Sequence, residues 1–390
     1  MPRRAALFRE SPVKMRAGET AMKTLFVNLG ERSYKIKIGN GLVNKIGDYI
    51  GELGFTSPPI VVTNPTVLRL HGPKLLQSLK GATEGPRVIR IGDGERFKNQ
   101  ATLGKIHSRL FQAHADRRSW ILAFGGGIVG DIAGFAAATF MRGIPYVNVP
   151  TTLLAQVDSA VGGKVGINVP QGKNLIGAFH QPAAVFLDPG ILRTLPSREL
   201  AAGLYEVIKY GAIRSEGLIR YLEKNLDRIL QCEPTVLQHI ALECCRIKAA
   251  VVARDERESN LRMILNYGHT VGHALEAATS YRRFKHGEAV AWGMLAALGY
   301  GRELGLLKSG DIHRLWVLIR RVKTLPHLGG ISIEEIWSAL MRDKKARSGK
   351  ISMVLLKNLG DSMICQDVNA AHLKKYLRQF IAAGGDPGTW

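Results

Sequence analysis

Three histidines, His269, His273 and His286, stand within 18 residues of a largely apolar segment of the chain. The stretch Tyr267 to Ala278 has helical periodicity, which places His269 and His273 four residues apart on one face. The polar turn that precedes His286 lets this residue fold back toward them. Three converging imidazoles could hold a zinc ion, whereas a lone histidine is more often a hydrogen-bonded core or surface residue. The pattern therefore favours a metal site.

A further candidate ligand, Glu206, lies in the apolar segment GLYEVIKYG, one helical turn before Lys209. A carboxylate in such a setting needs a partner. The partner is either Lys209, in an intrahelical ion pair, or a metal ion that two histidines also bind. Two histidines and one glutamate are typical of catalytic zinc sites, which keep coordination positions open for substrate. The residues alone leave both interpretations open.

A glycine-rich segment, FGGGIVGD, follows a strand pattern and opens a helical one, and Gly125, Gly127 and Gly130 fit the spacing G-x-G-x-x-G. The free N–H groups and the positive end of a helix dipole suit a dinucleotide pyrophosphate. The expected acid about twenty residues later, which would hold the ribose, is absent. The glycines therefore either serve helix–strand packing, or a dinucleotide takes its ribose ligand elsewhere, for which Glu95 is the candidate.

Several basic and amide side chains are candidates for binding an anionic substrate. Lys164 and Lys173 each follow a glycine in a glycine-rich, mostly apolar stretch, and Asn174 adjoins the second. As exposed loop lysines they would need no ligand, but with the glycine turns they favour a phosphate pocket. Lys248, Arg262 and Asn266 recur at helical intervals before the histidines. They form either a solvated helix face or contacts to a carboxylate or phosphate.

The hydrophobic pattern divides the chain into two parts. Strand patterns alternate with helical ones up to about residue 196, which predicts a parallel α/β sheet, with an early hairpin at its edge. From residue 197 onward the pattern is mostly helical, with one short strand pair near 350–356. The expected strands are Leu25 to Leu29, Tyr34 to Ile38, Ile60 to Thr63, Arg87 to Ile91, Ser119 to Phe124, Pro145 to Pro150 and Ala183 to Asp188.

Composition narrows the functional class. The net charge of +22 is spread along the chain and aromatic residues make up only 7%, so we expect no nucleic-acid partner. The charge suits attraction of a small anionic substrate. The longest apolar run contains an aspartate and five glycines, so we expect no membrane span. Cysteines without a paired pattern and the absence of a signal-type start favour the cytoplasm. Residues 1–22, rich in arginine and lysine, are expected to be a disordered extension.

The chain resembles the 3-dehydroquinate synthase family in six blocks that occur in the family's order. The resemblance covers roughly residues 23–378, and six ordered blocks are far more specific than an isolated glycine motif. The blocks are GGGIVGDIAGFAAATFMRG, VPTTLLAQVDSAVGGKVGIN, GKNLIGAFHQP, EVIKYG, DERESNLRMILNYGHTVGHALE and HGEAV.

The resemblance implies an enzyme, usually a homodimer, that uses bound NAD and a divalent metal, Zn²⁺ or Co²⁺, in the shikimate pathway. It implies a Rossmann-like α/β domain over 23–196, an all-α metal- and substrate-binding domain over 197–390, and an active site in the cleft between them. The substrate would be 3-deoxy-D-arabino-heptulosonate 7-phosphate, an anionic sugar phosphate. The products would be 3-dehydroquinate and phosphate.

The resemblance also implies roles for individual residues. The metal ligands would be Glu206, His269 and His286, whereas spacing alone pairs His269 with His273. Catalysis would involve His273, as a substrate-side proton relay, with Lys164, Asn174 and Lys209. The substrate would contact Arg142, Lys164, Asn174, Lys248, Arg262, Asn266, His273 and one of Lys344 and Lys345. NAD would contact Asp93, Glu95, Lys98, Gly127, Gly130, Asp131, Thr151, Thr152, Asp158, Lys164, Lys173 and Thr194.

Two other enzyme classes share these features. A related sugar-phosphate cyclase, such as 2-epi-5-epi-valiolone synthase, would use the same cofactors on a substrate without a carboxylate. Lys248 and Arg262 weigh against it, because a neutral sugar would leave their charges unpaired. A metal-dependent polyol dehydrogenase would release its reduced cofactor, so net NADH formation would identify it.

Overall fold

The computed structural model describes residues 21–80, 85–258, 260–345 and 351–385, with side chains in the last helical turn before residue 346 described only up to Arg342. The chain divides into two compact units. The first comprises Met1–Leu195 and Gln231–Arg254, and the second comprises Pro196–Leu230 and Asp255–Trp390. The expected division at residue 196 placed 231–254 in the helical half, whereas its contacts group it with the first unit. Residues 1–20 of the expected extension lie outside the described residues.

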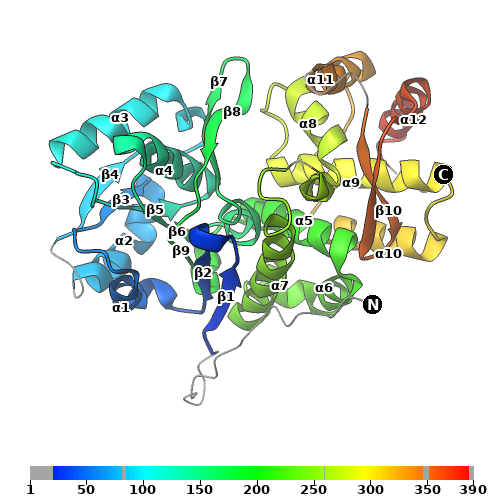
Figure 1. Ribbon diagram of the computed structural model, residues 1–390. Helices are drawn as coiled ribbons and strands as arrows, with labels where there is room; N and C mark the ends of the chain where they lie inside the picture. Colours follow the sequence, from blue (N-terminus) through cyan, green and yellow to red (C-terminus); the bar gives the residue numbers. More distant parts are fainter. Residues whose placement is uncertain (1–20, 81–84, 259, 346–350, 386–390) are drawn as a thin grey trace. The chain divides into compact units, whose positions relative to one another are not determined.

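The first unit is built on a sheet that has seven strands among the described residues, in the order β1-β2-β9-β6-β5-β3-β4 (Figure 1). Strands β1 and β2 pair antiparallel, as the early hairpin predicted, and the remaining neighbours pair in parallel. The strands are β1 (Lys23–Val27), β2 (Tyr34–Ile38), β3 (Ile60–Thr63), β4 (Arg87–Arg90), β5 (Ile121–Gly125), β6 (Tyr146–Pro150) and β9 (Ala184–Leu187).

Alternation along the strands gives this sheet two buried faces. In β3, Ile60 and Val62 pack in the cluster that holds α3 (Gln100–Gln112) and α4 (Gly127–Thr139). Val61 packs in the opposite cluster with α1 (Ile46–Ile50) and α2 (Pro65–Lys80). Because successive side chains point to opposite faces, a strand covered on both sides must be apolar at every position. The fully buried strand β5 meets that requirement, and β3 meets it at every position except its last residue, Thr63.

Helix α7 (Pro234–Val252) covers the edge of the sheet formed by β1, β2 and β9. Its Ala241, Cys245 and Ala249 pack in one cluster with residues of these strands. Gln238 of α7 donates to the carbonyl oxygen of Ala21 at 2.8 Å. These contacts explain why α7 belongs to the first unit although its neighbours in sequence are helices of the second.

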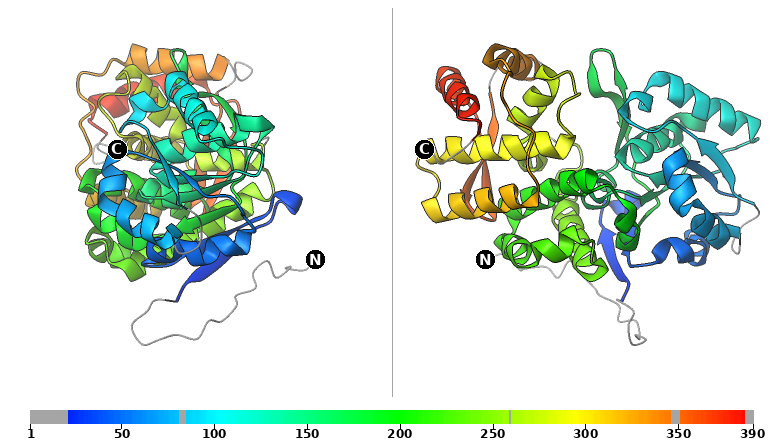
Figure 2. Two further views of the ribbon diagram at one scale, coloured as in Figure 1. Left: turned by 90° about the vertical axis from the view of Figure 1, so that its left-hand side faces the viewer. Right: turned by 180° about the vertical axis from the view of Figure 1, so that it is seen from behind.

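A second hairpin of the first unit consists of β7 (Lys164–Val169) and β8 (Gly172–Phe179) and projects from the sheet (Figures 1 and 2). The sequence did not predict it, because its glycines obscure the alternation of a strand pair. Gly166 and Gly177 face each other across the hairpin, and a Cβ on either would overlap the backbone of the opposite strand. The glycines therefore permit this strand pairing.

The second unit is mostly helical, as expected. Helix α9 is buried from Gly287 to Gly301, so it is the central helix, and the neighbouring helices supply the apolar surface around it. The helices are α5 (Ser197–Arg214), α6 (Glu216–Leu230), α8 (His269–Ala278), α9 (His286–Glu303), α10 (Ser309–Val322), α11 (Ile333–Lys345) and α12 (Ala370–Ala382). The expected strand pair is present as β10 (Met353–Asn358) and β11 (Asp361–Cys365).

Among the described residues, no helix is both long enough and apolar enough to cross a membrane. The four cysteines are free, with Cys232, Cys244 and Cys245 buried.

Candidate active site

The three histidines of the second unit converge in the structure. His269 begins α8, His273 lies one turn later, and His286 begins α9. One ligand atom from each lies within 4.8 Å of the others. The ring centroid of His269 lies 5.2 Å from that of His273 and 5.3 Å from that of His286. The two helix starts therefore bring together side chains that could bind one metal ion.

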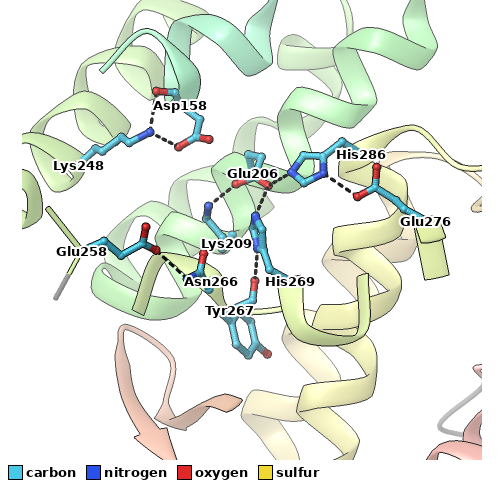
Figure 3. Close-up of polar contacts among 10 residues, drawn as sticks. All are labelled: Asp158, Glu206, Lys209, Lys248, Glu258, Asn266, Tyr267, His269, Glu276 and His286. Carbon is cyan, nitrogen blue, oxygen red and sulfur yellow. Dashed lines mark hydrogen bonds and ion pairs between the residues drawn. The ribbon is translucent and has the colours of Figure 1, made fainter. Parts of the chain in front are cut away.

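Glu206 completes this cluster from α5. Its Oε1 lies 3.7 Å from Nε2 of both His269 and His286 (Figure 3). The side chain is fully buried, and Lys209 forms an ion pair with its other oxygen. Neither oxygen accepts a hydrogen bond of good geometry from the described part of the chain. Burial of a carboxylate with few hydrogen bonds is unfavourable unless cations balance its charge. Lys209 and a metal ion could each pair with one oxygen, so Glu206 can be both an ion-pair partner and a metal ligand.

His269 and His286 both present Nε2 to Glu206, and the Nδ1 atom of each has another partner. Nδ1 of His269 lies 3.1 Å from the carbonyl oxygen of Tyr267, and Nδ1 of His286 lies 3.1 Å from Oε2 of Glu276 (Figure 3). Burial lowers the pKa of His269 well below its ordinary value, so its imidazole is neutral. Burial also lowers the pKa of His286, but the hydrogen bond and charge of Glu276 together with Glu206 raise it overall.

These side chains fit a divalent cation. Two imidazole nitrogens and one carboxylate oxygen, drawn from three helices, form a donor set that zinc enzymes use with an open coordination position. A neutral imidazole has the lone pair that binding requires. A cation bound between Oε1 of Glu206 and the two Nε2 atoms would balance the negative charge buried at this point.

Glycines set the approach of the helices that carry these ligands. A Cβ at Gly287 would overlap the carbonyl oxygen of Ala202 in α5, and one at Gly293 would overlap the carbonyl oxygen of Gly268. Gly287 follows His286, and Ala202 lies one helical turn before Glu206. The missing side chain therefore lets the start of α9 lie directly on α5 and brings His286 to Glu206.

Replacing Gly287 with alanine should therefore loosen the site. The new methyl group must push the first turn of α9 away from α5, at a cost of about 1–3 kcal/mol as for other overpacked cores, and it should lower bound zinc per chain. The measurements are the unfolding midpoint and zinc content after dialysis. Gly301→Ala in the same helix is the control, because its Cβ would meet only Leu307, at 3.4 Å. Equal behaviour of the two variants would contradict the close-approach argument.

Arg262 and Asn266 lie before the histidines in the 3-10 helix η8 (Leu261–Asn266). The backbone N–H of Arg262 donates to Asp255 at 2.9 Å, and its guanidinium donates to the carbonyl oxygen of Glu256. Nδ2 of Asn266 donates to Glu258 at 3.0 Å (Figure 3). The acidic segment DERE thus holds both predicted substrate-binding side chains.

In the first unit, Lys248 is paired with a residue that the sequence assigned to the cofactor. Its Nζ donates to Oδ1 of Asp158 at 2.6 Å and to the carbonyl oxygen of Asp158 at 2.8 Å (Figure 3). The lysine is buried in α7. This pair links α7 to the π-helical turn η6 (Ala155–Ser159), which lies next to Thr151 and Thr152 in the sequence.

The glycine motif stands where β5 ends and α4 begins. The N-cap residue of α4 is Gly126, which has no side chain to accept from the N–H groups of the first turn, and such N–H groups suit an anionic ligand. A Cβ at Gly126 would lie 3.0 Å from Thr152, and one at Gly127 would lie 3.0 Å from Ser159. The bare backbone between β5 and α4 fits a pyrophosphate at a helix N-terminus.

Lys98 is the centre of a polar cluster near this helix. Its Nζ pairs with Asp131 of α4 and with the side-chain oxygen of Asn174 in β8. Burial raises the pKa of Asp131, and Lys98 opposes that shift. Glu95, the predicted ribose ligand, accepts from Asn168 of β7 at 2.6 Å. The unpredicted hairpin therefore brings Asn174, a predicted substrate residue, to residues predicted for NAD.

The remaining predicted residues have varied surroundings. Asp93 accepts from Thr66 at 3.1 Å, and the hydroxyl of Thr194 lies 2.8 Å from Nε2 of His71. Lys164 and Arg142 are exposed, and Lys173 is partly exposed. Lys344 and Lys345 end α11, but their side chains lie outside what the structure describes. Sequence reasoning missed Glu276, although a carboxylate on the apolar helix of His269 was a signal.

Comparison with known proteins gives a consistent result. The sequence model described as 3-dehydroquinate synthase N-terminal matches residues 88–202, and the one described as 3-dehydroquinate synthase C-terminal matches residues 203–346. A protein named 3-dehydroquinate synthase from Pelotomaculum thermopropionicum is 47% identical over 93% of this chain and 97% of its own length. One from Geobacter metallireducens is 49% identical over 87% of this chain and 94% of its own length.

Two solved structures share the fold. A 2-deoxy-scyllo-inosose synthase complexed with carbaglucose-6-phosphate, NAD⁺ and Co²⁺ is 26% identical, with a TM-score of 0.82 over 91% of this chain and 99% of that chain. A 2-epi-5-epi-valiolone synthase from Streptomyces hygroscopicus with NAD⁺ and Zn²⁺ bound is 25% identical, with a TM-score of 0.82 over 96% of this chain and all of that chain.

Proposed function

Because the chain belongs to the 3-dehydroquinate synthase family, we propose that it converts 3-deoxy-D-arabino-heptulosonate 7-phosphate into 3-dehydroquinate and phosphate. The two relatives of this name described above match 93% and 87% of the chain, at 47% and 49% identity. The single structural observation that carries the proposal is the buried carboxylate of Glu206, whose Oε1 faces Nε2 of His269 and His286 and accepts no hydrogen bond from the described residues.

Two cofactors belong to this proposal, and the residues present fit both. Glu206, His269 and His286 would hold a divalent cation, Zn²⁺ or Co²⁺. The start of α4 and the cluster around Lys98 would hold NAD, with Glu95 at the ribose. When bound, NAD would supply reversible hydride transfer at the C5 carbon, and the cation would supply stabilisation of negative charge on the C5 oxygen. The chain's own residues must bind the substrate and move its protons.

The substrate's two anionic ends require separate positive partners. We assign the carboxylate to Lys248 and Arg262, because a guanidinium can bind a carboxylate through two parallel hydrogen bonds. We assign the phosphate to Arg142, Lys164, Asn174, Asn266 and His273, with Lys344 or Lys345 as a further cation. Lys248 and Asn266 would exchange their present partners, Asp158 and Glu258, for substrate.

Proton transfer is assigned to histidine and lysine side chains. Oxidation at C5 makes the C6 proton acidic, and its loss expels phosphate by β-elimination. His273 is exposed and lies beside the two proposed metal ligands, so it can pass a proton between the substrate and solvent. Lys209 keeps Glu206 in place through their ion pair and adds positive charge near the C5 oxygen. An intramolecular aldol step would then close the ring.

Substrate and quaternary structure complete the proposal. The ligand is a small sugar phosphate, and the protein acts as a homodimer, with neither nucleic acid nor membrane as a partner. The net charge of +22 attracts the anionic substrate over long range.

The decisive experiment measures phosphate release from 3-deoxy-D-arabino-heptulosonate 7-phosphate by purified protein with NAD and Zn²⁺, before and after chelation. Sedoheptulose 7-phosphate is the parallel substrate, and absorbance of NADH is recorded throughout. Turnover of the first substrate alone, abolished by chelation and without net NADH, is expected. Turnover of sedoheptulose 7-phosphate alone would instead indicate a different sugar-phosphate cyclase, such as a 2-epi-5-epi-valiolone synthase, and net NADH would indicate a dehydrogenase.

Removing either proposed carboxylate partner should weaken substrate binding while leaving the metal in place. Arg262→Ala and Lys248→Ala each remove a charged hydrogen bond, which contributes about 1.5–3 kcal/mol, so KM should rise roughly 10- to 100-fold. KM and zinc content are measured together. Arg321→Ala, at an exposed position of α10, is the control for net charge. Loss of zinc in either active-site variant would mean that these residues support the metal instead.

A further inference from the structure

We propose that Glu276 is a positioning residue for the metal site, which holds the imidazole of His286 so that Nε2 points at the cation. This inference rests on the proposed function, because it assigns His286 as a metal ligand. Glu276 would contact His286, a proposed metal ligand, and would contact neither the metal nor the substrate.

The geometry places Glu276 behind His286. Oε2 of Glu276 lies 3.1 Å from Nδ1 of His286, on the side of the ring opposite the atom that faces Glu206 (Figure 3). Glu276 is on α8, whereas His286 begins α9, so this contact joins two helices of the second unit. Its side chain is only 4% exposed. A charged side chain is rarely buried without a polar partner, and His286 is that partner for Glu276.

A carboxylate at this position selects one tautomer of His286. The carboxylate can only accept, so the proton must sit on Nδ1, which leaves the lone pair of Nε2 free for a cation. The hydrogen bond also fixes the rotation of the ring and increases its basicity as a ligand. Glu276 therefore decides which atom His286 presents and how strongly that atom binds.

The imidazole of His269 is oriented by a backbone carbonyl oxygen and not by a side chain. Its Nδ1 faces the carbonyl oxygen of Tyr267 at 3.1 Å, an acceptor that comes with the chain trace into α8. Tyr267 is itself fixed, since it is fully buried and its hydroxyl donates to the carbonyl oxygen of Met294 at 3.3 Å. Of these two histidines, His286 is the one oriented by a side chain, that of Glu276, and substitution of Glu276 can test this.

The competing interpretation is that Glu276 merely ties α8 to α9. A purely structural tie predicts a lower unfolding midpoint for a variant but no specific change in metal affinity. The positioning role predicts weaker metal binding even where the fold is kept. Zinc affinity of the folded protein, measured without substrate or NAD, separates the two.

The test compares zinc affinities of full-length proteins stripped of metal, by competition with a chromogenic chelator. Glu276→Gln keeps an acceptor but removes the charge, and Glu276→Met removes both at similar volume. The control is Glu223→Gln, because Glu223 also pairs with a side chain of another helix, Arg314, at 2.9 Å within the same unit. Unfolding midpoints of the metal-free proteins are recorded in parallel.

We expect about tenfold weaker zinc binding for Glu276→Gln and up to about 100-fold for Glu276→Met, the range found for such supporting residues, with Glu223→Gln unchanged. Wild-type affinity in both Glu276 variants, or equal weakening in the control, would overturn the inference while leaving the metal site intact. If the wild-type protein itself bound no zinc, the metal assignment of the proposed function would fail, and the inference with it.

Discussion

Replacing Glu206 with glutamine should abolish tight zinc binding and lower kcat/KM by at least about a thousandfold, because Lewis-acid stabilisation contributes several kcal/mol. Glutamine has nearly the same shape, so the packing of α5 is kept. It lacks the negative charge that both the cation and Lys209 require. The measurements are zinc stoichiometry and phosphate release with saturating NAD.

The partner variant Lys209→Met distinguishes the two interpretations of Glu206. If Glu206 only neutralised Lys209, both variants would be destabilised, since breaking a buried pair costs about 3–5 kcal/mol, and zinc binding would change in neither. If Glu206 is a ligand, Lys209→Met keeps zinc and Glu206→Gln loses it. Retention of wild-type zinc affinity by Glu206→Gln would refute the ligand set.

The sheet of the first unit was predictable because the apolar composition of its strands distinguishes them from the turns and helices around them. β5 is a continuous apolar run, and β3 is apolar up to its last residue, Thr63. The seven strands of the sheet lie within a few residues of the expected positions. The hairpin β7–β8 was not predictable by the same rule. Its Gly166 and Gly177 contribute no side chains to an alternating pattern, and they matter only once the two strands face each other.

The candidate metal site was only partly predictable from spacing. Periodicity correctly placed His269 and His273 on one helix, but it cannot say which imidazole faces a carboxylate from a helix some sixty residues earlier in the chain. That information lies in close packing between helices, at Gly287 above all. The assignment of α7 to the first unit was missed for a similar reason. The apolar pattern of a helix predicts that one face is buried, but it does not predict which element packs against that face.

Replacing Lys98 with methionine should weaken NAD binding and destabilise the first unit. Lys98 is almost fully buried and pairs with Asp131 and Asn174. Its loss leaves the Asp131 carboxylate without that partner at the start of α4, which costs about 3–5 kcal/mol, and it removes a proposed contact to the cofactor. Each charge-assisted hydrogen bond contributes about 1.5–3 kcal/mol, so the NAD dissociation constant should rise roughly 10- to 100-fold.

A double variant separates these two effects. Lys98→Met with Asp131→Leu removes both charges, and apolar replacement of a buried pair is often neutral or stabilising, so the unfolding midpoint should recover. NAD binding should not recover, because a hydrocarbon side chain cannot replace the ammonium group. Recovery of both quantities together would show that Lys98 serves the fold alone. Failure to recover either would show that Lys98 and Asp131 do not act as a pair, and titration of NAD against all three proteins measures this directly.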